Sequence, residues 1–147
     1  MIALLQRVLE AKVSIAGQTV GQIGSGLLVL VCAEPQDTPA QALRLVDKLL
    51  KLRLFTDAAG KMNRSVVEVG GGLLIVSQFT LAADLSGGNR PSFSGAAGAE
   101  LGRSLYDTVL RLARERHPVV ASGVFGADMQ VSLVNDGPVT IPLRIIP

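Results

Sequence analysis

The alternation of apolar and polar residues predicts a β-hairpin at the start of the chain. Residues 2–15 alternate in this way, Gly17 supplies a tight turn, and residues 19–23 return as the second arm. The next apolar run, LLVLVC at 27–32, does not alternate, which is typical of a strand covered on both faces.

Two later segments have the 3.6-residue spacing of amphipathic helices. The first, at 39–53, begins with Thr38 as an N-cap followed by proline, and its apolar residues recur on one face. The second, at about 98–116, turns leucines inward and arginines outward, and His117-Pro118 ends it.

Shorter β segments occupy the rest of the chain. DAAGK at 57–61 predicts a hairpin loop and 65–69 a short strand. LLIVSQFTL at 73–81 predicts a buried strand that becomes polar at its end, and 127–134 alternates cleanly. The total is roughly seven strands and two long helices, segregated rather than alternating. We therefore expect one α+β domain over 1–147, with a rolled antiparallel β-sheet.

The segment VNDGPVT at 134–140 interrupts the last alternating strand. Proline cannot donate to a sheet ladder, and glycine loses much conformational freedom when it is ordered. On these residues alone, Gly137-Pro138 predicts a turn that ends the strand, and a functional role needs support from elsewhere in the chain.

The composition indicates an aliphatic core and a reducing environment. The chain is 48% hydrophobic but only 3% aromatic, and its apolar runs are too short to span a bilayer. Polar residues such as Gln6 and Glu10 interrupt the N-terminal run, so we expect no secretion signal. The one cysteine, Cys32, excludes an internal disulfide and lies in an apolar run, which predicts a small buried hydrophobe.

A net charge of +2 permits a nucleic-acid partner without requiring one. The basic residues are nevertheless unevenly placed, because several arginines gather in and before the second predicted helix: Arg90, Arg103, Arg111, Arg114 and Arg116. A solvated helix face is the ordinary explanation of this cluster, and a contact with RNA is the alternative.

The available side chains exclude several common catalytic sites. The only histidine, His117, precedes a proline at a helix end and has no nearby nucleophile in the sequence. One histidine and one cysteine cannot supply a tetrahedral zinc site, and the glycine runs at 24–26 and 70–72 lack the lysine of a phosphate-binding loop. We therefore expect no metal and no cofactor, and any enzyme activity has to work without a histidine base.

The polar end of the strand at 73–81 is a candidate site. Alternation would send Ser77 and Phe79 to one face and Gln78 and Thr80 to the other. Either neighbouring groups satisfy these side chains, or strand-end N–H groups and small side chains form a pocket for a polar ligand.

Several segments taken in order resemble D-aminoacyl-tRNA deacylase from residue 1 to about residue 140. They are SQFTLAAD, NRPSF and ADMQVSLVNDGPVT, together with the opening IALLQRV and the loop DAAGKMN. SQFT and GPVT in this order and separation are highly specific, whereas either alone would be weak. The chain departs from the family in the loop at 85–89 and in its tail IPLRIIP, both outside the two motifs.

The resemblance implies an enzyme that hydrolyses the ester between a D-amino acid, or wrongly attached glycine, and the terminal adenosine of tRNA. It also implies a cytoplasmic homodimer that needs no metal. The expected fold then becomes a rolled, barrel-like antiparallel β-sheet with two long helices packed on it.

The same resemblance implies which residues build the site. Four consecutive residues would line the pocket with their backbone N–H groups gripping the substrate: Ser77, Gln78, Phe79 and Thr80. Five others would bind the substrate or support it: Phe125 and Met129 as walls, and Gly137-Pro138, fixed by Arg7, as a cis peptide that enters the partner subunit's pocket. Backbone carbonyls there would leave no room for a side chain on the L face.

Two mechanisms and two other classes of function remain open. The scissile ester is activated and has a ribose hydroxyl beside it, so the substrate's own 2′-hydroxyl could transfer the proton. Thr80 as a nucleophile is the alternative, and we favour the first because no base near Thr80 is visible. A non-catalytic RNA-binding module would need more aromatic residues than four Phe and one Tyr. An ester hydrolase of small metabolites would not need the arginine-bearing helix.

Overall fold

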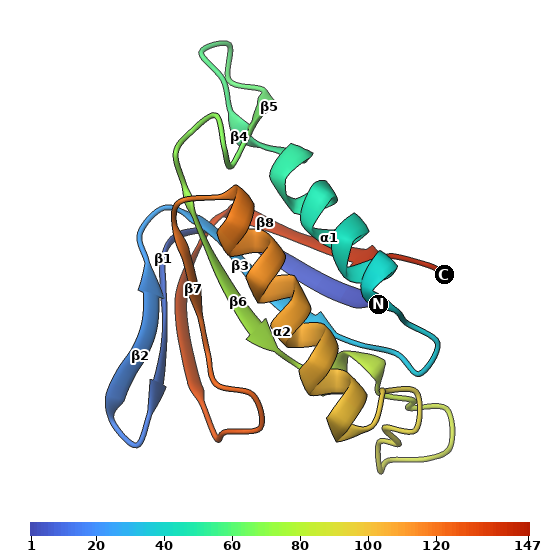
Figure 1. The fold of residues 1–147 in the computed structure, drawn as a ribbon. Coiled ribbons are helices and arrows are strands. Elements are labelled where there is room, and N and C mark those ends of the chain that lie inside the picture. Colours follow the sequence, from blue (N-terminus) through green and yellow to red (C-terminus); the bar gives the residue numbers. More distant parts are fainter.

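The computed structural model, which describes residues 1–147, arranges six strands in one rolled sheet and lays two helices against it (Figure 1). The strands are β1 (Ile2–Ile15), β2 (Gln18–Ile23), β3 (Gly26–Cys32), β4 (Arg53–Thr56), β5 (Met62–Ser65), β6 (Gly72–Ser77), β7 (Val120–Ser122) and β8 (Gln130–Arg144). The helices are α1 (Pro39–Lys51) and α2 (Ala99–Arg116), with a 3-10 turn η1 at Phe79–Ala82. Strands β4 and β5 form a separate two-stranded hairpin.

β1 is the centre of the sheet because it pairs along both edges. One edge pairs antiparallel with β3 and then with β2, and the other pairs antiparallel with β8 over nearly its whole length. The pairs β3–β6 and β6–β7 are parallel, so the sheet is mixed. Strands β2 and β7 nearly close the roll, since a Cβ at Gly21 would meet the Ser122 carbonyl oxygen at 2.3 Å. The expected barrel-like α+β fold with two helices is confirmed. The sheet is not wholly antiparallel as expected, because the connections from β3 to β6 and from β6 to β7 each pass through a helix and return the chain in the same direction.

The two helices follow the predictions closely. α1 begins with a capping box, in which Thr38 Oγ1 accepts from the Ala40 N–H and Gln41 Oε1 accepts from the Thr38 N–H at 2.7 Å. Both helices cover the same face of the sheet and contact each other (Figure 1). Neither is both long and apolar enough to cross a membrane.

Three predictions of local structure were wrong. The segment at 73–81 is not one strand, because β6 ends at Ser77 and the chain turns into η1. The segment at 65–69 is a turn, since Ser65 and Glu68 exchange hydrogen bonds between side chain and backbone. β7 was not predicted at all, because three residues are too few to show a period.

A fourth error concerns Gly137-Pro138, which does not end a strand. β8 continues through it to Arg144, and the register passes from Gln6↔Thr140 to Val8↔Asn135. Residues 136–139 therefore bulge opposite Arg7 alone. A bulge is one of the few places where a strand accommodates a proline without a ladder hydrogen bond.

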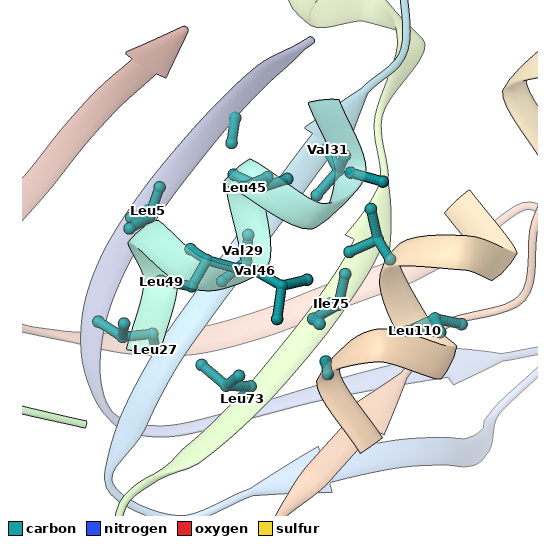
Figure 2. Close-up of a cluster of buried hydrophobic side chains, with 14 of the residues drawn as sticks. Leu5, Leu27, Val29, Val31, Leu45, Val46, Leu49, Leu73, Ile75 and Leu110 are labelled. Atoms are coloured by element: carbon teal, nitrogen blue, oxygen red, sulfur yellow. The ribbon is translucent and has the colours of Figure 1, made fainter. Parts of the chain in front are cut away.

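Two apolar clusters lie on opposite faces of β3 and β6. The larger one contains 21 buried residues and joins the sheet to both helices, with Leu45, Val46 and Leu49 of α1 facing the strands (Figure 2). The smaller cluster of seven includes Leu74 and Val76 on the opposite face. Both strands are thus buried on two faces, as the apolar run at 27–32 indicated.

Candidate active site

A small cavity lies where β6 ends, next to the N-terminal half of α2. Its volume is about 30 Å³, enough for about one water molecule. Ser77 and Phe79 line it from the end of β6, Gly102 and Tyr106 from α2, and Phe125 from the loop after β7. Most of the wall is apolar, so the Ser77 hydroxyl is one of its few polar groups.

The chain changes direction at the end of β6 through a short series of backbone hydrogen bonds. The Gln78 N–H donates to the Val31 carbonyl at 2.8 Å, and the Leu81 N–H then donates to the Gln78 carbonyl at 3.2 Å. The N–H groups of Phe79 and Thr80, in the first turn of η1, have no partner inside that segment. Because η1 is a turn, the strict alternation predicted from Ser77 to Thr80 is wrong beyond Ser77.

Thr80 is exposed and has no base beside its hydroxyl. The side-chain amide of Gln78 donates to Thr80 Oγ1 at 2.5 Å, and no carboxylate, lysine or histidine hydrogen-bonds to that oxygen. The amide is not a proton acceptor of useful basicity. Thr80 therefore lacks the activation that a nucleophilic hydroxyl requires.

The phenol and the thiol in the cavity wall are held in their neutral forms. Burial raises the pKa of Tyr106 to about 12, and its hydroxyl donates to the Ile75 carbonyl at 2.8 Å. Burial, reinforced by the nearby Glu34 carboxylate, also raises the pKa of the Cys32 thiol. Cys32 is buried, as predicted, and neither group is suited to act as a base or a nucleophile at neutral pH.

An exposed aromatic pair lies at the mouth of the cavity. Phe79 is 55% exposed and meets Phe93 edge to face, with ring centroids 5.1 Å apart and an interplanar angle of 77°. Paired backbone hydrogen bonds between Asp84 and Ser92 close the loop that carries Phe93. Phe93 belongs to the NRPSF segment of the resemblance but received no role from the sequence, because only the tertiary structure brings it to Phe79.

The structure separates the two predicted wall residues. Phe125 lines the cavity and lies 6.0 Å from Tyr106, measured between ring centroids. Met129 instead packs on the smaller apolar cluster, where its Sδ approaches Gly123. Only Phe125 is therefore brought together with Ser77 and Phe79 within one chain.

The bulge at 136–139 is exposed at its tip and held firmly from below. The Gly137–Pro138 peptide bond is cis, Gly137 has φ +132°, and both residues are exposed. Arg7 donates to the Asp136 carbonyl at 3.1 Å and to the Leu54 carbonyl at 2.8 Å, and it pairs with the Asp136 carboxylate at 3.3 Å. The predicted contact between Arg7 and this segment is thus present.

Asn135, which the sequence analysis did not select, completes the support of the bulge. Its side-chain amide donates to the carbonyls of Arg7 and Val139 at 2.9 and 3.0 Å. It therefore ties the two ends of the bulge to β1. The nearest signal in the sequence was its position two residues before Gly137.

Within one chain the bulge lies far from the cavity. Ser77 of β6 pairs with Val31 of β3, which pairs with Ala3 of β1. The bulge faces Arg7, four residues farther along β1, and three strand spacings separate β8 from β6. At roughly 3.3 Å per residue and 4.8 Å per strand, the two motifs are on the order of 15–20 Å apart.

The charged groups do not form a uniform basic face. On α2, Arg111 pairs with Glu115 at 3.0 Å, Arg114 donates to the Ser122 hydroxyl, and Arg116 pairs with Asp47. Arg103 differs, since its guanidinium lies over the Phe125 ring, 4.8 Å from the centroid. No group of three or more His, Cys, Asp or Glu side chains is arranged to hold a metal ion.

The chain is similar to known proteins over nearly its whole length. The family model described as D-Tyr-tRNA(Tyr) deacylase matches residues 4–144. The D-aminoacyl-tRNA deacylase of Methylibium petroleiphilum is 74% identical over 145 residues, which cover 99% of this chain and 95% of the relative.

Two solved structures share the fold over nearly their whole length. The one described as c-Myc DNA Unwinding Element Binding Protein has a TM-score of 0.94 and 38% identity, with full coverage of both chains. The one described as a probable eukaryotic D-amino acid tRNA deacylase has a TM-score of 0.83 over 98% of each chain. Its 20% identity makes it a likeness of fold alone.

Proposed function

The chain belongs to the D-Tyr-tRNA(Tyr) deacylase family, and we propose that the end of β6, around the small cavity beside Ser77, binds the aminoacyl end of a D-aminoacyl-tRNA and hydrolyses the ester. Its relatives are deacylases, so the chain is an enzyme. The observation that carries the proposal is the 74% identity to a D-aminoacyl-tRNA deacylase over 99% of the chain, a range that includes both SQFT and GPVT. The products are the free D-amino acid and a tRNA with an unmodified terminal adenosine.

The backbone N–H groups of Phe79 and Thr80 bind the ester carbonyl in this proposal. Both lack a partner inside η1, and the Gln78–Val31 hydrogen bond anchors the segment immediately before them. Donors that are fixed before the substrate arrives stabilise the negative charge that develops on the carbonyl oxygen. Ser77 supplies a hydroxyl inside the cavity, and Phe79 presents an exposed ring at its mouth.

Water is the nucleophile, and the substrate carries its own proton relay. Water attacks the ester carbonyl carbon, the bond from that carbon to the ribose oxygen breaks, and the water proton passes through the neighbouring hydroxyl to the leaving oxygen. The proposal is supported by what surrounds the site: Thr80 has only an amide partner, and Tyr106 and Cys32 both keep their protons. Effective positioning can replace a strong base for an activated ester.

A second copy of the chain completes each pocket. The bulge and the cavity of one chain are too far apart to hold the same ester, yet the tip of the bulge is exposed. β8 pairs only with β1, so its other edge is unpaired along a 15-residue strand, an arrangement that proteins normally cover. We place Gly137 and Pro138 in the homodimer's shared substrate site, with Met129 as one of its walls.

Chiral selection in this arrangement is steric. The backbone carbonyls of Gly137 and Pro138, held by Arg7 and Asn135, face the α-carbon of the substrate and leave no space for an L side chain. A D side chain points out of the pocket, and glycine has no side chain to exclude. The enzyme therefore also clears glycyl-tRNA, and it acts in the cytoplasm, where tRNA is charged.

The test compares four substrates with the purified protein. D-Tyr-tRNA and Gly-tRNA should be hydrolysed, L-Tyr-tRNA should be spared, and the methyl ester of D-tyrosine should react far more slowly. Stable tRNA binding without release of tyrosine would instead indicate a binding module. Rapid cleavage of the small ester would indicate a metabolite hydrolase, and equal rates on D- and L-Tyr-tRNA would refute the chiral selection.

A further inference from the structure

Arg103 is distinguished from the other arginines of α2 by what its guanidinium contacts. The other three arginines of the helix bind side chains of their own chain, through Glu115, Ser122 and Asp47. Arg103 is exposed and makes no ion pair and no hydrogen bond, although Glu100 and Asp107 lie one turn away on either side. The cluster that looked uniform along the sequence therefore contains one arginine that is free to bind something else.

Arg103 also lies at the edge of the substrate cavity. Gly102, its neighbour in α2, lines that cavity together with Phe125. The Arg103 guanidinium covers the Phe125 ring at 4.8 Å, so a single aromatic ring separates the positive charge from the cavity. In Figure 1, this N-terminal half of α2 lies beside the loop that follows η1.

The position of the guanidinium over the Phe125 ring prepares it for an anion that approaches its edge. A cation–π contact uses the flat face of the group and leaves its N–H donors free at the edge. Two parallel N–H donors match two oxygens of a phosphate, which makes arginine well suited to bidentate phosphate contacts. Stacking on Phe125 also lowers the entropy that Arg103 loses when such a contact forms.

Resting on the proposed function, we propose that Arg103 binds the phosphodiester on the 5′ side of the terminal adenosine of tRNA. The scissile ester lies at the end of β6 beside the cavity, and the phosphate of the same nucleotide is only one ribose away, at the rim where Arg103 lies. Arg103 is thus a binding residue that positions the 3′ end of the tRNA relative to the pocket. It explains how the enzyme favours a nucleotide-linked ester over a free amino-acid ester without a broad basic surface.

The experiment compares substrates with and without this phosphate. Wild type, Arg103→Gln and the matched control Arg111→Gln, two turns along the same helix, are assayed on D-Tyr-tRNA and on D-tyrosyl-adenosine. Arg103→Gln should lower kcat/KM on D-Tyr-tRNA by about 10–100-fold, mainly through KM, as for the loss of a charge-assisted hydrogen bond. It should leave the rate on D-tyrosyl-adenosine unchanged.

Further readouts strengthen the test. In Arg103→Gln, the affinity for tRNA should depend less steeply on salt. The slope of log affinity against log salt concentration should be smaller in magnitude by about 0.7, the value for one phosphate on a single strand. Arg103→Lys should recover part of the loss, because it keeps the charge without the bidentate geometry. Arg111→Gln should match wild type on both substrates.

Two outcomes would overturn the assignment. Equal losses on both substrates would mean that Arg103 supports the pocket through Phe125, and no loss on either would mean that it contacts nothing. If wild type releases no tyrosine from any substrate, the proposed function fails separately. Binding of uncharged tRNA then decides the Arg103 proposal, which equal affinity and equal salt slope in wild type and variant would refute.

Discussion

The end of β6 and the bulge of β8 are irregular for different reasons, and the difference decides how each responds to mutation. At the end of β6, one ladder hydrogen bond from Gln78 is followed by a local 3-10 turn, so the geometry beyond that bond depends on residues close in sequence. The bulge of β8 is shaped by Arg7 and Asn135, whose hydrogen bonds connect residues more than 100 positions apart in sequence. The first region displays free backbone donors, and the second displays a backbone held by side chains.

The largest expected effect is the loss of a backbone donor at the end of β6. Phe79→Pro removes that N–H, and proline is tolerated at the first position of a helical turn, where the N–H has no partner within the turn. Removing one oxyanion donor should lower kcat on D-Tyr-tRNA by about 10²–10³-fold. Circular dichroism and Tm should stay near wild type, and the control Phe79→Ala, which keeps the N–H, should lose much less.

Thr80→Val examines the side chain of the same segment. It keeps the shape and removes the hydroxyl, so substrate-assisted hydrolysis predicts a loss of less than about tenfold. A loss of about a thousandfold or more with an intact fold would make Thr80 the nucleophile. The comparison of the two variants separates backbone chemistry from side-chain chemistry.

At the bulge we expect an effect smaller than that of Phe79→Pro, because the substitution changes the shape of the backbone and removes no catalytic donor. At Gly137 the backbone has φ +132°, and a Cβ would lie 2.9 Å from Val139 Cγ2 and 3.1 Å from Arg7 Nη2. Gly137→Ala should lower D-Tyr-tRNA hydrolysis by about 10–100-fold, cost about 1–3 kcal/mol of stability, and narrow the ratio of D to L rates.

The control for Gly137→Ala is Gly17→Ala. Gly17 has φ +79° but nothing within 4 Å of its Cβ position, so it carries backbone strain without a clash. The Gly17→Ala substitution should lower Tm and leave the hydrolysis rates of D-Tyr-tRNA and L-Tyr-tRNA unchanged. A Gly137→Ala enzyme that loses rate but keeps the full D/L ratio would show that selection resides elsewhere in the pocket.

Mixed dimers test whether the two regions meet across subunits. Co-expression of the Gly137→Ala and Phe79→Pro chains gives a heterodimer in which one pocket has an intact β6 end and an intact partner bulge. Activity per dimer should therefore return to about half that of wild type. Kinetics of the purified heterodimer, isolated by two affinity tags, provide the measurement, and a fully active wild-type monomer would contradict the arrangement.

The smallest effect concerns Tyr106, which anchors the β6 end through the Ile75 carbonyl. Because its folded pKa is raised to about 12, the unfolded chain releases this proton first, near pH 10. The contribution of the protonated Tyr106 to the free energy of unfolding is therefore complete below pH 10 and is lost as the pH rises toward 12. Tyr106→Phe should cost about 1 kcal/mol near pH 7, and its Tm should fall less steeply than that of wild type above pH 10. Its activity profile between pH 7 and 9 should keep the wild-type shape.

Local signals in the chain were sufficient where one element determines its own structure. Both helices were predicted within two residues, because an apolar stripe and terminal signals such as Thr38 and His117-Pro118 act over a few residues. The resemblance identified the family through SQFT and GPVT, which the comparisons confirm. The same local reasoning was wrong for Gly137-Pro138, since a proline ends a strand in most contexts.

The sequence by itself determined the fold class and the family, because these depend on residue types, short-range periods and short motifs. The tertiary structure alone decided that β8 passes through its proline, that Phe125 and Met129 lie in different clusters, and that Phe93 reaches Phe79. It also decided which of four similar arginines remains unpaired beside the cavity. The physical reason is common to all of these: register, sheet curvature and side-chain pairing join residues far apart in the chain, and no local pattern records them.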